Sequence, residues 1–148
     1  MTTKIEKLGV RSHKYRTNKV TYLEINNKLI CPICFQHKEN WHVNHFVMQM
    51  DGGRNTKYNL TVLCAMCHRM LHDGEDEKRM FVYKRLNMFM MSRYGILGRK
   101  DILQKTLEKM NMALSISNVR NVHKTVKAEC EVAYQDELRR TLLAQPTR

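Results

Sequence analysis

Four cysteines arranged as two short pairs are the residues of this chain with the clearest chemical meaning. The segments Cys31-Pro-Ile-Cys34 and Cys64-Ala-Met-Cys67 are separated by twenty-nine residues. Each CxxC loop is short enough for both of its sulfur atoms to bind one ion, and thiolates in a tetrahedral set favour zinc over hard cations. Four thiolates leave no coordination position open for a substrate. We therefore expect Cys31, Cys34, Cys64 and Cys67 to form a structural zinc site.

A disulfide framework is the alternative interpretation of paired cysteines, but it is typical of secreted chains. The N-terminal stretch MTTKIEKLGVRSHKYR has no apolar segment of the kind found in secretory signals, and no run of residues approaches the length of a transmembrane helix. We therefore expect an intracellular, cytoplasmic protein without a membrane partner. Zinc would stabilise such a fold, since metal binding contributes roughly 10–16 kcal/mol to the folding of zinc-finger peptides.

A second group of polar residues lies beside the cysteine pairs and has the chemistry of a hydrolytic site. The stretch Trp41-His42-Val43-Asn44-His45-Phe46 reads as a short strand, and His68 and His72 follow the second pair. Neutral imidazole is both a general base and a metal ligand near neutral pH. If zinc joins the pairs, His45 and His68 flank one open site for a hard metal. A phosphodiester there is polarised by the cation while a histidine takes a proton from water.

The elements that position these residues can be predicted from turn residues and alternating hydrophobicity. Residues 20–30 are expected to form a strand pair with a turn at Asn26-Asn27, and residues 41–46 a second strand. Residues 51–59 form a loop, and an extended piece at 60–63 leads into a helix that starts near Cys64 or Ala65. The polar and basic residues 1–19 are expected to form a flexible arm or a strand that orders on a partner.

The C-terminal half has the spacing of helices. From Asp76 onward apolar residues recur at helical intervals until Gly95 ends the run. A further helix is expected from about residue 101, with one side formed by Leu103, Leu107, Met110 and Leu114. The stretch SISN at 115–118 is a predicted break supplied by capping residues. A last helix then spans about 119–143, with one side formed by Val122, Val126, Cys130 and Ala133.

The charge of the chain favours a polyanionic partner. Twenty-six Lys and Arg against 14 Asp and Glu give a formal net charge of +12. Residues 1–30 contribute +5, residues 31–76 contribute −1 and residues 77–148 contribute +8, so both flanks are basic and the middle is nearly neutral. A solvated surface can produce such an excess. Because the excess of positive charge lies outside the segment with hydrolytic chemistry, contact with nucleic acid is the favoured interpretation.

These residues also resemble a known family. His45, Asn59 and His68 follow one another in the order and spacing of the HNH endonucleases, with Gly52-Gly53 in the expected loop. The wider pattern NHF…DGG…NLTVLCAMCH is similar to the zinc-containing branch of that family, which includes phage recombination and homing nucleases. The resemblance covers roughly residues 30–73. It implies an α+β fold: a small ββα-metal core with a four-cysteine structural zinc site, followed by a helical C-terminal half.

The resemblance implies a role for each matching residue. His45 is the general base that acts on the attacking water, and Asn59 holds the loop and orients the histidine backbone. His68 is a ligand of the catalytic cation, Mg²⁺ or Mn²⁺. Asn44 stands where the family usually has an Asp or His metal ligand, and a neutral amide binds a cation more weakly than a carboxylate does.

Two further histidines are candidates for the same cation. His42 is the alternative to Asn44, because both share one face of a regular strand. His45 would then face the other way unless the strand ends or bulges at 44–45, which is the irregularity we expect. His72, four residues after His68, is a supplementary ligand or a phosphate contact.

Two functional hypotheses follow. The first is a metal-dependent HNH DNA endonuclease that hydrolyses phosphodiester bonds of duplex or branched DNA. A monomer would nick one strand and a homodimer would break both, as in phage or mobile-element homing. The alternative is a non-catalytic zinc-ribbon nucleic-acid-binding protein, and an RNA nuclease would share the chemistry of the first. The expected parts are a basic arm and strand (1–30), the nuclease core with zinc (31–76) and a basic helical extension (77–148).

Overall fold

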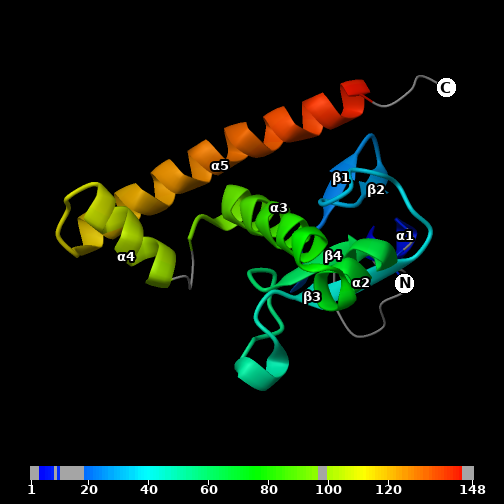
Figure 1. The fold of residues 1–148 in the computed structure, drawn as a ribbon, viewed down its shortest axis with the longest axis horizontal. Helices are drawn as coiled ribbons and strands as arrows, with labels where there is room; N and C mark the ends of the chain where they lie inside the picture. The colour runs from blue at the N-terminus through cyan, green and yellow to red at the C-terminus, as the bar shows by residue number, and fades with distance from the viewer. Residues whose placement is uncertain (1–3, 9, 11–18, 97–99, 145–148) are drawn as a thin grey trace. The chain divides into compact units, whose positions relative to one another are not determined.

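The computed structural model describes residues 4–8, 10, 19–96 and 100–144 of the chain, which forms two compact units (Figure 1). Unit 1 is Met1–Arg85 and unit 2 is Leu86–Arg148. Small β-hairpins occupy the first unit and helices the second, so the predicted α+β class with a helical C-terminal half is confirmed. The three-part division at residues 30 and 76 stays a prediction. No helix in the described ranges has both the length and the apolar character needed to cross a bilayer.

The first described residues of unit 1 form a short helix rather than an extended segment. Helix α1 is Lys4–Lys7, so the predicted arm or strand was wrong at these four residues. The Nζ atom of Lys4 lies 3.0 Å from Glu24 Oε2, and Leu8 packs beside buried Val10, which together hold this segment on the hairpins. Residues 1–3, 9 and 11–18 of the predicted arm lie outside the described residues.

The first hairpin has the predicted place and turn. Strands β1 (Leu23–Ile25) and β2 (Lys28–Ile30) pair antiparallel, with Leu23 opposite Ile30. The two residues of the turn, Asn26 and Asn27, have φ angles of 52° and 61°. Asparagine tolerates this left-handed conformation, which a two-residue hairpin turn requires. Strand β2 therefore ends directly before Cys31 and delivers the first cysteine pair.

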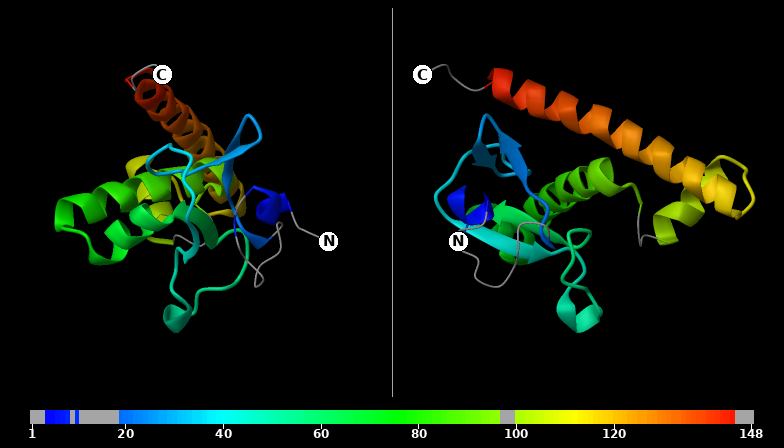
Figure 2. Two further views of the ribbon diagram at one scale, coloured as in Figure 1. Left: turned by 90° about the vertical axis from the view of Figure 1, so that its right-hand side faces the viewer. Right: turned by 180° about the vertical axis from the view of Figure 1, so that it is seen from behind.

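The second hairpin carries the residues of interest. Strands β3 (Trp41–His45) and β4 (Leu60–Cys64) are antiparallel, with Trp41 opposite Cys64 and His45 opposite Leu60. The register runs without a bulge to His45, where β3 ends, so the expected irregularity takes the form of a strand end. Every residue of β4 is buried. The loop between the strands contains the short helix η2 (Gln49–Asp51) and extends away from the hairpin (Figures 1 and 2).

Apolar packing fixes the hairpin within unit 1. Val20 and Leu29 pack with Leu60 and Val62 of β4, and Trp41 and Val43 of β3 lie partly buried against them. Thr21 bridges to β4 from the side opposite β3, through Thr21 N–H to the carbonyl of Leu60 at 2.8 Å. Strand β4 is consequently paired along both edges, which explains its complete burial.

Two helices follow β4 without a long connection. Helix α2 (Ala65–Asp73) packs on both β3 and β4, and α3 (Asp76–Tyr94) begins three residues after α2 ends. The N-terminal part of α3 belongs to unit 1, where Arg85 lies against the rings of Phe35 and Phe81 and donates to the carbonyl of Ile33 at 2.7 Å. This arginine links α3 to the loop that carries the first cysteine pair.

Unit 2 consists of the end of α3 with helices α4 (Lys100–Lys109) and α5 (Ile116–Ala144), of which α4 packs on α5. One cluster of its buried residues is Met91, Ile96, Leu107 and Val122, with partly buried Leu103, Met112, Val126 and Cys130 around them. Burial raises the pKa of the Cys130 thiol, as expected of a packing residue. At Gly95, φ is +70°, and α3 ends there as predicted.

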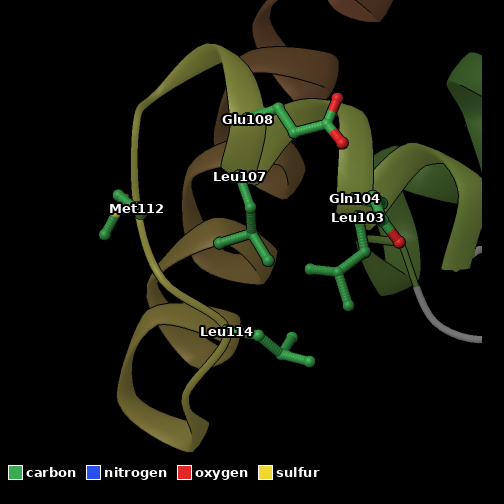
Figure 3. Close-up of a pocket in the computed structure, with 6 residues that line it drawn as sticks. All are labelled: Leu103, Gln104, Leu107, Glu108, Met112 and Leu114. Atoms are coloured by element: carbon green, nitrogen blue, oxygen red, sulfur yellow. The ribbon is translucent and has the colours of Figure 1, made fainter.

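Two helix boundaries differ from the prediction. The prediction that Met110 and Leu114 lie on the same helix as Leu103 and Leu107 was wrong, because α4 ends at Lys109. Asn111 has a φ of 52°, and the N–H of Met112 donates to the carbonyl of Leu107 at 2.9 Å, which is a Schellman cap. Beyond this cap, Leu114 is 77% exposed at the rim of an apolar pocket (Figure 3).

The last helix starts three residues earlier than predicted. The Oγ atom of Ser115 accepts the N–H of Asn118 at 3.1 Å, so Ser115 caps α5 and the rest of SISN is helical. On its apolar side Ala133 is exposed, contrary to prediction, and Tyr134 is buried beside Phe89 at a ring-centroid distance of 5.2 Å. The apolar side of α5 repeats every four residues, so Tyr134 belongs to it and Ala133 does not.

Candidate active site and metal centre

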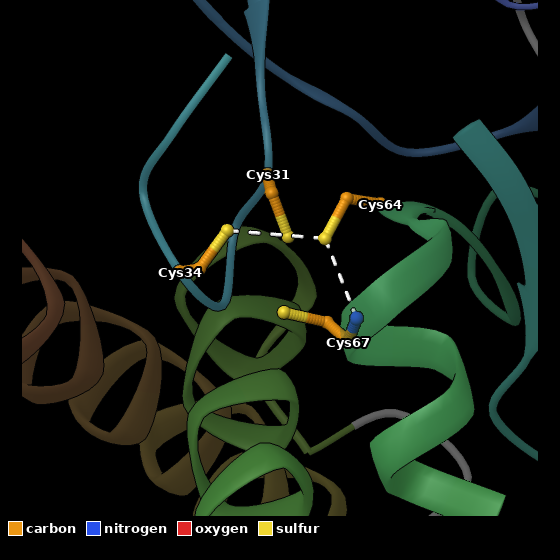
Figure 4. A group of neighbouring side chains, drawn as sticks. All are labelled: Cys31, Cys34, Cys64 and Cys67. Carbon is orange, nitrogen blue, oxygen red and sulfur yellow. Dashed lines mark hydrogen bonds between the residues drawn. The ribbon is translucent and has the colours of Figure 1, made fainter. Parts of the chain in front are cut away.

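The four paired cysteines come together in unit 1 (Figure 4). Their sulfur atoms all lie within 4.8 Å of one another, and the Sγ atoms of Cys34 and Cys64 are 3.8 Å apart. A metal–sulfur bond of roughly 2.3 Å gives a tetrahedron with edges of roughly 3.8 Å. The thiol set therefore fits a zinc ion in both chemistry and spacing.

Local backbone structure builds each half of this cluster. After Cys31 the chain turns back, with the N–H of Phe35 donating to the carbonyl of Cys31 at 2.9 Å and Phe35 itself at a φ of 58°. On the other side Cys64 caps α2, since its Sγ accepts the N–H of Cys67 at 3.4 Å. One pair thus sits in a tight loop and the other on the first turn of a helix.

The cluster favours thiolates at two of its members. A hydrogen bond from Cys31 is the largest cause that lowers the pKa of Cys34, to about 7. Hydrogen bonds from Cys31, Cys34 and Cys67 lower the pKa of Cys64. The same contacts raise the pKa of the other two thiols, chiefly through the hydrogen bond with Cys34 for Cys31 and the hydrogen bond with Cys31 for Cys67. Since a metal ligand must be the thiolate, a cation would have to displace the protons of these two thiols.

Strand β3 and helix α2 bring three histidines into contact. The Nδ1 atoms of His42 and His68 are 2.9 Å apart, and the Nε2 atoms of His68 and His72 are 3.2 Å apart. Both ring nitrogens of His68 therefore face another imidazole. Burial is the largest cause that lowers the pKa of His68 to about 4, followed by the charges of His72 and His42. His68 is consequently neutral at physiological pH and able to offer a lone pair.

Asn44 is a buried residue of β3 and lies opposite Thr61 of β4. Its side chain is 2% exposed, and its Nδ2 atom is buried without a hydrogen-bond partner among the described residues. A buried amide group that lacks a partner costs free energy, and because Nδ2 is a donor, the partner it lacks is a hydrogen-bond acceptor. Asn44 lines one pocket with His68 and His72, and an amide oxygen and imidazole nitrogens are atoms that a divalent cation accepts as ligands.

His45, at the end of β3, is oriented by the loop that follows. Its Nε2 atom lies 2.8 Å from Asn55 Oδ1, which also accepts the side-chain N–H of Gln49 at 3.3 Å. Because an amide oxygen is only an acceptor, Nε2 of His45 carries the ring proton. Nδ1 is then the basic nitrogen of the neutral imidazole.

Asn59 joins both ends of the same loop. Its Oδ1 atom accepts the N–H of Val47 at 2.6 Å, and its Nδ2 atom donates to the carbonyls of Val47 and Arg54, each at 2.9 Å. Gly53 lies against this junction, and a Cβ atom there would be 1.8 Å from the carbonyl oxygen of Val47. The loop can close around Asn59 only because residue 53 has no side chain.

One pocket of unit 1 collects these groups. It encloses about 440 Å³ and is lined by Asn44, His45, His68 and His72, with Val43 and Met48–Met50 completing the wall. His42 and Asn59 do not line it: the first contacts His68 from outside and the second holds the loop. The structure thus places His45 and His68 at one cavity, while their roles stay predictions.

Asn55 is the site residue that sequence reasoning missed. It lies in the loop GGRNTKYN, ten positions after His45, and only the closure of that loop brings the two side chains together. The strand predicted at 41–46 includes Phe46, but β3 ends at His45, and the ring of Phe46 stacks on Tyr83 of α3 at a centroid distance of 6.0 Å. No local spacing in the sequence signals either contact.

Comparison with known families agrees with this geometry. Residues 30–74 match the family model described as HNH endonuclease. This part of the chain is therefore an HNH endonuclease domain, and its four cysteines agree with the zinc-binding CxxC…CxxC variant. No curated protein and no solved structure matches the chain. The family resemblance stated from the sequence is confirmed.

Proposed function

We propose that this protein is a metal-dependent endonuclease that hydrolyses phosphodiester bonds in DNA. The observation that carries the proposal is the convergence of His45, Asn44, His68 and His72 on one pocket, in a domain that matches the HNH endonucleases. A general base and a set of metal ligands at one cavity are the minimum equipment for metal-assisted hydrolysis.

His45 acts as the general base in this proposal. Asn55 holds its Nε2 proton, so Nδ1 takes the proton of the attacking water. Asn59 keeps the loop closed through both Val47 and Arg54 and thereby fixes the end of β3 on which His45 stands. Asn55 and Asn59 thus both help to fix the position of the proton acceptor, Nδ1 of His45.

The catalytic cation, Mg²⁺ or Mn²⁺, would be held by Asn44, His68 and His72. Its chemistry is to polarise the phosphodiester and stabilise the departing oxygen. The spacing of 3.2 Å between the two Nε2 atoms suits two ligands of one ion, which favours the ligand role over the phosphate-contact role for His72. His42 touches Nδ1 of His68, away from that edge, so it orients a ligand.

Zinc in the four-cysteine cluster completes the proposal. The cluster ties the loop after β2 to the start of α2, and α2 carries His68 and His72. Zinc therefore has a structural role: it holds the helix that presents two imidazoles to β3.

Cleavage of supercoiled plasmid tests the proposed activity. The wild-type protein should nick or linearise plasmid with Mg²⁺ or Mn²⁺ and leave it intact with EDTA. The variant His45→Ala should cut about 10²–10⁴ times more slowly, because it lacks the general base. His37→Ala serves as control, since His37 is absent from the pocket wall. Equal cutting by wild type and His45→Ala would contradict the assignment.

Asn44 supports a second candidate, a zinc-containing nucleic-acid-binding protein without catalysis. A neutral amide at this position gives a weaker cation site than a carboxylate does. The same plasmid assay separates the candidates: DNA that is bound but never cut, with any of several divalent ions, favours the binding protein.

The homing function of phage and mobile elements is a finer proposal. It requires a cut at a chosen sequence, which selection of cleaved sites from a randomised DNA library measures. A monomer has one pocket and is expected to nick. If cleavage is indifferent to sequence, the homing role falls and the nuclease remains.

A further inference from the structure

The N-terminal half of α5 has a polar face directed away from the core of unit 2. Ser117, Arg120, Asn121 and Lys124 are all exposed and follow the helical spacing i, i+3, i+4 and i+7. Val122 and Val126, between and beyond them, pack into the core. Since the core fixes the rotation of the helix, the four polar side chains share one outward face, which we call the α5 polar face.

The α5 polar face forms one wall of a groove. The groove encloses about 760 Å³, and Tyr94, Ile116 and His123 line it together with the four polar residues. The N–H of Ile96 donates to Nδ1 of His123 at 3.1 Å, and this leaves Nε2 as the N–H donor of the neutral ring. The α5 polar face therefore has several N–H and O–H donors and an aromatic ring at its edge.

The charge along α5 is strongly uneven. No Asp or Glu occurs between Glu108 and Glu129, a stretch that contains Arg120, Lys124 and Lys127. In the rest of the helix, Glu129, Glu131, Asp136 and Glu137 outnumber Arg139 and Arg140.

The cations of the two halves also differ in their partners. Within the described part of the chain, no ion pair is found for Arg120 or Lys124, whereas Arg139 lies 3.8 Å from Asp136. Two exposed cations on one face, without acidic neighbours, are suited to a polyanion.

We propose that the α5 polar face binds double-stranded DNA, with Arg120 and Lys124 on backbone phosphates. The partner follows from the proposed function, and the residues of this face differ from those that line the pocket of His45. A helix about 10–12 Å wide fits the major groove of B-DNA, which is about 12 Å wide, whereas the major groove of duplex RNA is too narrow for side chains to read. Ser117 and Asn121 supply neutral hydrogen-bonding groups beside the two cations.

Fluorescence anisotropy with a labelled random-sequence DNA duplex tests the proposal. All variants carry His45→Ala, so that the duplex stays intact, and they contain zinc. The double variant Arg120→Ala/Lys124→Ala should bind at least about tenfold more weakly, and the slope of log K against log salt should fall by about 1.8, because two phosphate contacts are lost. The control Arg139→Ala/Arg140→Ala removes the same charge from the same helix and should change both quantities much less.

Three results would overturn the assignment. They are an equal loss in the two double variants, no loss in Arg120→Ala/Lys124→Ala, and tighter binding of duplex RNA or single-stranded DNA than of duplex DNA. The charge-preserving variant Arg120→Lys/Lys124→Arg should retain the salt slope, which separates a phosphate contact from a folding defect.

Failure of this proposal and failure of the nuclease proposal look different. Plasmid cutting by the wild type, with unchanged duplex affinity in Arg120→Ala/Lys124→Ala, removes the α5 polar face and keeps the nuclease. If duplex binding depends on Arg120 and Lys124 but the wild type never cuts plasmid, the nuclease proposal is wrong and the α5 polar face remains a DNA-binding surface.

Discussion

At the scale of single residues, the proposed site depends on which nitrogen of each imidazole has a partner. His68 contacts His42 through Nδ1 and His72 through Nε2, while His45 contacts Asn55 through Nε2. A metal ligand needs a lone pair on a ring nitrogen, and a general base needs a lone pair that the attacking water can reach. The partners of each ring therefore decide which of these two roles it can take.

The protein without added divalent cation should contain a histidine that stays neutral in mildly acidic solution. The pKa of His68 is lowered from 6.5 to about 4 by burial and by its two histidine neighbours. The unfolded chain binds this proton more readily than the folded chain does. The contribution of neutral His68 to the unfolding free energy is therefore fully present above about pH 6.5 and is lost as the pH falls toward 4. Histidine NMR titration measures the midpoint. A His68 midpoint near 6.5 would contradict the packing described for α2 and β3.

Asn59→Asp should destabilise unit 1, although the two side chains have the same shape. The carboxylate would face the carbonyl oxygens of Val47 and Arg54, which now accept N–H groups at 2.9 Å. Two lost donors and the new repulsion should cost about 2 kcal/mol or more of unfolding free energy. Urea unfolding measures this, with Asn27→Asp in an exposed turn as control. Equal stability of the two variants would show that the loop does not depend on the amide.

At the scale of elements, a loop between two short strands and one helix create the pocket. Strand β3 ends at His45, the loop returns through Asn59, and α2 adds two histidines directly after the second cysteine pair. Turn residues and alternating hydrophobicity predicted these elements well, because Asn26-Asn27, the cysteine spacing and Gly95 act locally. They failed at Met110 and Leu114, where the cap around Asn111 overrides the apolar spacing.

Gly53→Ala should open the loop that positions His45. The added Cβ atom would meet the carbonyl oxygen of Val47 at 1.8 Å and Asn59 Nδ2 at 2.9 Å. Relief of such overpacking typically costs about 1–3 kcal/mol, and cleavage should fall with the displacement of His45. Gly52→Asn is the matched control, since no atom lies within 4 Å of a Cβ atom there and asparagine tolerates its φ of +87°. Unchanged cleavage in Gly53→Ala would count against a positioned loop.

At the scale of the whole chain, two units have separate cores, and only the first contains the cysteine cluster. Val20, Leu29 and Val62 belong to one core, and Met91 and Val122 belong to the other. The CxxC spacing was enough to predict the cluster, because short loops limit where a second sulfur atom can lie. The contact of His45 with Asn55 and the stacking of Phe46 on Tyr83 depend on tertiary closure, so no local pattern could predict them.

Removal of zinc should act selectively on unit 1. Without the metal, the four thiols lose the ion that joins the loop after β2 to α2, and bound zinc contributes roughly 10–16 kcal/mol in zinc-finger peptides. Hydrogen exchange of the full chain after chelation should show lost protection in β3, β4 and α2. The helices α4 and α5 should keep theirs. Loss of protection in both units at the same rate would contradict independent cores.

The most direct test of the account separates metal binding from proton transfer at the pocket. Mn²⁺ binding, followed by electron paramagnetic resonance, and single-turnover plasmid cleavage are measured on the same zinc-containing samples. His68→Ala should lose both Mn²⁺ affinity and cleavage, whereas His45→Ala should keep Mn²⁺ affinity and lose about 10²–10⁴-fold in cleavage rate. If His68→Ala binds Mn²⁺ as the wild type does, or if His45→Ala cuts at the wild-type rate, the pocket is not the hydrolytic centre.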